Sequence, residues 1–172
     1  MALTRISNQS LTSVTALPAA ITTGKILQIV QGTSTTEKST TGTSFVDTHL
    51  SATITPSSTS SKILLSCTQI IQVYKSGGSY GTGRWKIVQT IGGTSTDVTV
   101  GGDSSNGNVF CFDYGSNGIN IYRPTNYTRL LSPSTTSAIT YKTQIAKGSN
   151  GGTAIYAFDG KDTGTMVLLE VE

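Results

Sequence analysis

The stretch that decides the fold is residues 55–74, TPSSTSSKILLSCTQIIQVY. It begins with a polar run, residues 56–61, made of the residue types that form loops. From Lys62 onward the odd positions read Ile63, Leu65, Cys67, Gln69, Ile71 and Val73, with apolar residues dominating. Because successive side chains of a strand point to opposite faces, this period of two predicts a long, half-buried antiparallel strand. We expect Ile63, Leu65, Ile71 and Val73 to face the core.

The composition extends this prediction to the whole chain. The chain of 172 residues contains 19 glycines, and only 12% of all its residues are charged. Ser and Thr are frequent. Small and β-branched polar residues suit turns and strands, whereas helices usually carry Ala, Leu, Glu and Lys. The length is that of one domain with a core of its own. The sequence therefore predicts a single all-β domain.

Further short alternating runs, separated by turn signals, follow the central stretch on both sides. We expect strands at residues 25–31, 45–55, 84–91, 96–100, 109–114, 119–122, 127–131, 139–147, 153–158 and 165–172, with turns at residues 32–42 and at Gly92 and Gly93. Residues 1–24 have no regular period and are expected to form an extended N-terminal arm. The domain, residues 25–172, is predicted to be an antiparallel, jelly-roll-like β-sandwich, with an immunoglobulin-like sandwich as the alternative.

One predicted strand, residues 109–114 (VFCFDY), is apolar on both faces. A strand with two apolar faces is covered on both sides. We expect the second sheet to cover one face and a second subunit to cover the other.

Charge and hydropathy exclude two classes of partner. The formal net charge is +3, and the 12 Lys and Arg residues are scattered singly, so no basic run follows a nucleic-acid backbone. No apolar segment approaches the length of a membrane span, and the N-terminus lacks the apolar core of a secretory signal. We expect no nucleic acid, no membrane and synthesis in the cytoplasm.

Neither the cysteines nor the acidic turns form a pattern of metal ligands. Cys67 and Cys111 are expected to be buried free thiols, and a disulfide between them is the alternative. Asp159 and Asp162 are expected to cap a turn, with a contribution to Ca²⁺ binding as the alternative. The loop at residues 103–108 lacks the bidentate Glu of a calcium loop. We predict no metal and no other cofactor.

The sequence offers no convincing catalytic group. His49 follows Asp47 at the same strand parity, and we expect a surface histidine rather than a general base. The protein is therefore predicted not to be an enzyme.

A ligand or interface loop is a better candidate. The segment NIYRPTNYTR, residues 120–129, places several groups in or beside one expected loop: Tyr122, Arg123, Asn126, Tyr127 and Arg129. Tyrosines with amides and guanidinium groups stack on sugars or anchor protein interfaces. The alternative is a loop whose tyrosines only pack over the end of the sandwich.

Several phrases together carry a family resemblance. They are KILQIVQ (residues 25–31), TSFVDT (43–48), SATITPSSTSSKILL (51–65), SPSTTSAITYKTQIA (132–146) and MVLLEVE (166–172). In this order they resemble a recurrent β domain of virion structural proteins from tailed phages, notably those infecting cyanobacteria and other aquatic bacteria. The resemblance covers about residues 25–172. It implies a jelly roll, a homotrimer and a place on the virus surface, and it carries no catalytic motif.

Two functions follow from the resemblance. The first is a capsid decoration (cement) protein that binds other virion proteins, above all the major capsid protein. The second is a tail fibre or receptor-binding tip that recognises host surface polysaccharide.

The N-terminal arm is expected to be the attachment device, because its apolar residues have no regular face to hide them: Leu3, Ile6, Leu11, Val14, Leu17 and Ile21. Such groups gain free energy when they lie along a neighbouring protein. A disordered tail, or an extra strand on its own sandwich, are the alternatives.

Overall fold

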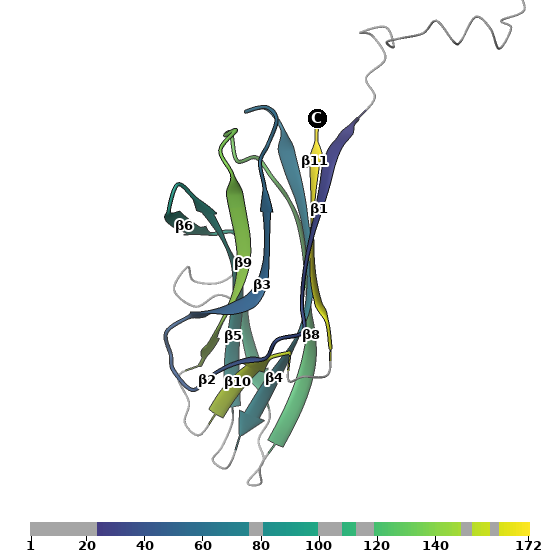
Figure 1. Cartoon of the computed structure of the whole chain (residues 1–172). Helices are drawn as coiled ribbons and strands as arrows, with labels where there is room; N and C mark the ends of the chain where they lie inside the picture. Colours follow the sequence, from purple (N-terminus) through teal and green to yellow (C-terminus); the bar gives the residue numbers. More distant parts are fainter. Residues whose placement is uncertain (1–23, 76–80, 100–107, 113–118, 149–152, 159–161) are drawn as a thin grey trace, which may run out of the picture.

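The computed structural model describes residues 24–75, 81–99, 108–112, 119–148, 153–158 and 162–172. Within these residues every regular element is a β-strand. Sheet A contains β1 (Ile26–Ser34), β2 (Lys38–Thr40), β4 (Lys62–Lys75), β8 (Ile119–Leu131), β10 (Thr153–Ala157) and β11 (Gly164–Val171). Sheet B contains β3 (Val46–Ile54), β5 (Gly81–Ile91), β6 (Thr94–Asp97), β7 (Asn108–Phe112) and β9 (Ile139–Lys147). The two sheets face each other, and the prediction of an antiparallel β-sandwich is confirmed (Figure 1).

Several short strands share one position in a sheet. β11 pairs with the first half of β4 and β10 with its second half. β1 and β2 follow along β11 and β10, and β6 and β7 both lie along β5. Sheet A therefore has the order β1/β2, β11/β10, β4, β8, and sheet B has the order β3, β9, β5, β6/β7. Four positions in each sheet, with the chain crossing between sheets, make the arrangement of a jelly roll.

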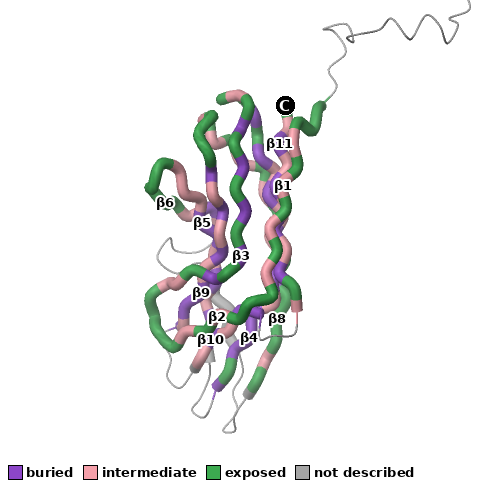
Figure 2. Tube along the Cα trace, viewed as in Figure 1, coloured by how far each residue is buried: buried purple, intermediate pink, exposed green. Residues whose placement is uncertain are grey.

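The core lies between the sheets and is filled by alternate residues of each long strand. Along β4 the predicted core residues Ile63, Leu65, Ile71 and Val73 are all buried, which confirms that prediction. Figure 2 shows buried and exposed positions alternating along β3. Gln69 lies on the buried face of β4, where its side-chain oxygen accepts a hydrogen bond of 2.9 Å from the Trp85 indole N–H. That bond explains how a polar residue occurs within an apolar run.

The turn predicted at Gly92 and Gly93 is also present. Both glycines have positive φ angles, 55° and 84°, and they connect β5 to β6 as a two-residue hairpin. Two successive positive φ angles are typical of the tight turn that matches the twist of paired strands.

Three predicted boundaries were wrong. Residues 32–42 were expected to be a turn region, but β1 continues to Ser34 and β2 follows it. The short strand expected at residues 96–100 is β6, Thr94–Asp97. The strands expected at residues 119–122 and 127–131 are one continuous strand, β8, which passes through Pro124. Pro124 is tolerated because β8 is the edge strand beside β4, where a missing backbone N–H leaves no ladder bond unmade.

Candidate interaction surface

The residues predicted to form a ligand or interface loop lie instead on β8, and strand alternation separates them. Register with β4 places Arg123, Tyr127 and Arg129 on the inner face of sheet A, because they pair with its core-facing residues, but Arg123 is exposed. Tyr122 and Asn126 pair with outward-facing residues of β4. The five side chains therefore do not converge on one site, and the prediction of a loop is corrected.

Tyr127 and Arg129 hold the two sheets together. The Tyr127 hydroxyl and an Arg129 guanidinium N–H both donate to the backbone oxygen of Val98, at 2.7 and 2.6 Å. The Tyr127 ring also packs edge-on against Trp85, with ring centroids 6.4 Å apart. Since Val98 follows β6 in sheet B, these contacts close the edge of the sandwich. Tyr127 thus packs against the sandwich, as the packing alternative expected, whereas Tyr122 is exposed and neither lies in a loop.

The outward-facing Tyr122 belongs to a group that we call the tyrosine cluster: Tyr74, Tyr122 and Tyr156. Tyr156 and Tyr122 pair with Gln72 from opposite sides, and Tyr74 lies two residues further along β4 on the same face. Tyr74 and Tyr122 are exposed, and Gln72 beneath them is buried. The Gln72 amide donates to the side-chain oxygen of Asn120. Aromatic rings beside amides form a surface of the kind that binds sugars or proteins.

The other end of the same face is apolar. Ile29 pairs with Leu169, Leu169 with Leu64, and Leu64 with Leu130, so the four side chains form one row across β1, β11, β4 and β8. We call this row the apolar strip. Ile29 is 62% exposed and Leu130 is 51% exposed, while Leu64 and Leu169 are half-buried. Three strand spacings give the strip a length of about 14 Å.

Other apolar residues extend the strip toward the end of the sheet. Ile26, which is 58% exposed, pairs with Val171 in the neighbouring row. This end of β1 is where residues 1–23 join the domain, and the C-terminus lies beside it (Figure 1). Contiguous exposed apolar residues of this kind mark interaction sites.

The sequence contained a signal for the strip that we did not use. Leu64-Leu65, Leu130-Leu131 and Leu168-Leu169 are consecutive leucines within strands. Because neighbouring residues point to opposite faces, one leucine of each pair enters the core and the other must lie outside. The strands identified from sequence already required this apolar outer row.

Several predicted sites lie outside the described residues. These are the arm residues Leu3, Ile6, Leu11, Val14, Leu17 and Ile21, the loop at residues 103–108, and Asp159. β7 contains Cys111, but the side chains of this strand are also outside the description, including the face expected to pack on the second sheet and the face expected to bind a subunit. Cys67 is a buried free thiol, as predicted.

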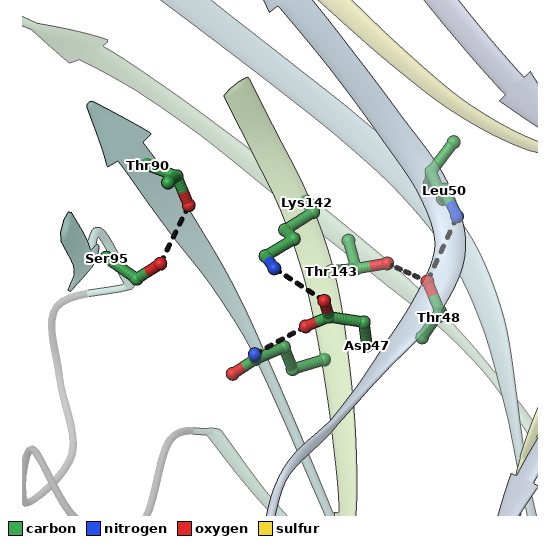
Figure 3. A network of polar contacts seen from close by, with 8 residues as sticks. Asp47, Thr48, Leu50, Thr90, Ser95, Lys142 and Thr143 are labelled. Atoms are coloured by element: carbon green, nitrogen blue, oxygen red, sulfur yellow. Dashed lines mark hydrogen bonds and ion pairs between the residues drawn. The ribbon is translucent and has the colours of Figure 1, made fainter. Parts of the chain in front are cut away.

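His49 is exposed on β3, and the neighbouring Asp47 forms hydrogen bonds with residues of β9. The carboxylate of Asp47 accepts hydrogen bonds from Lys142 and from the Gln144 amide of β9 (Figure 3). Burial alone would raise the pKa of Asp47, but these hydrogen bonds outweigh it and hold the pKa below its ordinary value. Asp47 therefore joins β3 to β9 rather than orienting His49.

Beside this pair, the hydroxyl groups of Thr48 and Thr143 share a buried hydrogen bond, and the Thr48 oxygen accepts from the backbone N–H of Leu50 (Figure 3). These contacts occur where the register between β3 and β9 shifts. These hydrogen bonds stabilise the pairing of β3 with β9.

In the part of the chain that the structure describes, no group of three or more His, Cys, Asp and Glu residues is placed to hold a metal ion. The same residues contain no helix long and apolar enough to cross a membrane.

Comparisons with known proteins do not identify a family for this chain. No protein-family profile matches the chain, and no curated protein matches it. Among solved structures, one titled "Structure of infectious bursal disease virus Gt strain" is similar at 14% sequence identity with a TM-score of 0.34. The match covers 84% of this chain and 40% of that one. We draw no functional argument from a similarity at this level. The protein is thus defined as a jelly-roll sandwich whose outer sheet face is apolar at one end and aromatic at the other.

Proposed function

We propose that the protein is a structural component of a virion, and that it acts as a trimeric decoration protein on the capsid of a tailed phage. Assembly takes place in the host cytoplasm, and the major capsid protein is the expected partner. The resemblance of residues 25–172 to virion proteins supports this proposal, and so does the jelly-roll order of the strands. The observation that carries it is the apolar strip on the outer face of sheet A.

The strip is difficult to explain in a protein that acts alone. Ile29 and Leu130 leave more than half of their surface in water, and complete burial of such a side chain is worth about 1.5–3 kcal/mol. A subunit of an assembly gains that free energy on binding its neighbour. The N-terminal arm contains the apolar residues Leu3, Ile6, Leu11, Val14, Leu17 and Ile21, and in our proposal it connects the domain to neighbouring virion subunits.

The first test of this function is the copy number per virion, measured by quantitative mass spectrometry. A decoration protein is present in hundreds of copies, whereas a fibre protein reaches a few tens. The second test uses virus particles that lack the protein. The full chain should bind them, and a chain that begins at Gly24 should still fold into the sandwich but fail to bind. Normal binding by the shortened chain would show that the arm is not the attachment device.

The alternative, a tail fibre tip that recognises host surface polysaccharide, is favoured by the tyrosine cluster. Its exposed residues Tyr74 and Tyr122 pair in register with Asn120 and Gln72, whose side chains carry amides. If this alternative is correct, replacing both exposed tyrosines with Ala should abolish binding to isolated host polysaccharide. The same variant should still bind virus particles if the protein decorates the capsid.

A further inference from the structure

The occupant of the apolar strip can be inferred from the way the chain enters β1. The backbone N–H of Glu172 donates to the oxygen of Lys25 at 3.2 Å, so the pairing of β1 with β11 persists almost to the first described residue. Gly24 and Lys25 form no turn, and neither has a positive φ angle. From Gly24 onward the chain therefore runs straight into β1. Among the described residues here, no turn directs the chain back over the strip of its own sandwich.

The arm is long enough to reach another molecule. Residues 1–23 span up to about 76 Å when extended, at about 3.3 Å per residue, and the strip is only about 14 Å long. Besides Met1, six of these residues are large and apolar, and Leu17 and Ile21 are the nearest of them to Gly24 in sequence. The arm thus offers apolar side chains over a length that exceeds what one strip requires.

We propose that the apolar strip of each molecule binds the N-terminal arm of a neighbouring copy, and that this exchange of arms holds the homotrimer together. The inference rests on the proposed trimeric decoration function and names the interaction that makes the trimer. The arm and the strip are different surfaces of one chain, so the contact is heterologous when each copy gives its arm to one neighbour and receives an arm from another. Contacts of this kind close into a ring when the rotation between copies allows it, and a trimer is one such ring. Each copy then supplies one arm and receives one.

The strip can be tested by replacing its two most exposed side chains in the full-length protein. The variant is Ile29→Thr with Leu130→Thr, because Thr suits a strand and removes most of the apolar surface. The matched control is Tyr74→Thr with Tyr122→Thr, which changes two exposed residues on the same sheet face at its other end, 42% and 40% exposed. Thermal melting of both variants shows whether the fold is retained.

Light scattering on the purified proteins measures the result. We expect the unaltered chain and the control to have the mass of a trimer, and the strip variant to have the mass of one chain, 18.0 kDa. A strip variant that remains trimeric, or an unaltered chain that is monomeric at micromolar concentration, would overturn the inference.

Cross-linking decides whose arm occupies the strip. One tagged copy carries Ala16→Cys in the arm, and a second, differently tagged copy carries Thr128→Cys, an exposed position in the row next to the strip. After co-expression, a short bismaleimide should join the two differently tagged copies. A chain without either substitution shows the background from the native cysteines. A third chain carries both substitutions. If this chain links only within itself and the two singly substituted copies do not link to each other, the arm folds back on its own sandwich and the exchange is refuted.

These experiments can refute arm exchange and capsid decoration independently of each other. A monomer that still covers the capsid in hundreds of copies refutes arm exchange and leaves decoration intact. A trimer joined by arms but present in only a few tens of copies refutes decoration and leaves the exchange intact.

Discussion

The side chain of Glu170 provides the sharpest test of how the sandwich is closed at the end where the arm begins. It lies on the inner face of β11 and is fully buried. One carboxylate oxygen accepts from the backbone N–H and the hydroxyl of Ser57, at 2.7 and 2.6 Å, and the other accepts from the Gln28 amide at 2.6 Å. The same Gln28 nitrogen donates to the backbone oxygen of Thr55 at 2.7 Å. Glu170 therefore joins β1, β11 and the segment between β3 and β4.

These hydrogen bonds predict a pH dependence. Burial by itself would raise the pKa of Glu170, but the hydroxyl of Ser57, the nearby Ser61, the Gln28 amide and the Ser57 backbone N–H lower it from 4.5 to about 2. Because the pKa is lower in the folded protein than in the unfolded chain, the carboxylate stabilises the fold fully above pH 4.5. That contribution is lost progressively as the pH falls from about 4.5 to about 2.

The change Glu170→Gln keeps the shape of the side chain but places an amide NH₂ against groups that themselves donate. Losing hydrogen bonds to a charged group costs about 1.5–3 kcal/mol. The lowered pKa sets an upper limit of about 3 kcal/mol, at 1.36 kcal/mol per pKa unit, which solvent screening at the rim of the sandwich reduces. We therefore expect the free energy of unfolding at pH 7 to fall by about 2 kcal/mol.

Urea denaturation at pH 7 and at pH 2.5 measures this difference between the unaltered protein and the variant. The difference should shrink by more than half at the lower pH. Glu172→Gln is the control, because this exposed carboxylate lies two residues further along the same segment and should have no effect. An equal loss of stability at both pH values would show that Glu170 does not act through its charge.

Three further predictions concern the core and the contact between sheets. Leu65→Ala should lower the free energy of unfolding by about 2–5 kcal/mol in urea denaturation, because Leu65 is fully buried. Gly32→Ala should lower the melting temperature markedly, since the new Cβ would overlap the backbone oxygen of Ser51, whereas Gly42→Ala should be tolerated because its Cβ would lie no closer than 3.5 Å to another residue. Cys67 should resist alkylation at pH 8 until the protein unfolds, because burial raises the pKa of its thiol to about 12.

The strand alternation that predicted the core was reliable because burial between two sheets imposes a strict period of two. On the strand predicted at residues 139–147, which is β9, this alternation places Ile139, Tyr141, Thr143 and Ile145 on one face, and all four are fully buried. The same rule failed at β8 because we read Pro124 as a strand break. Whether a proline interrupts a strand depends on whether that strand lies at the edge of a sheet, which is a property of the tertiary fold.

The candidate site was harder to predict than the core. Grouping Tyr122, Arg123, Asn126, Tyr127 and Arg129 by their closeness in sequence assumed a loop, in which neighbouring side chains can converge. In a strand, closeness in sequence separates side chains instead. The residues that meet on one face, such as Tyr122 and Tyr156, come from different strands and depend on register.

Strand alternation also explains why the apolar strip differs from the rest of the outer face. The fold requires only one leucine of each consecutive pair, the one that enters the core. Position 64, 130 or 169 would be filled equally well by Thr, which suits a strand and is compatible with water; Thr68 and Thr165 occupy such outward positions in the middle of the same sheet. Yet three strands place leucine at one row, and β1 completes that row with Ile29. Because folding of the single chain does not require this row, the row supports our proposal that the outer face of sheet A binds a partner.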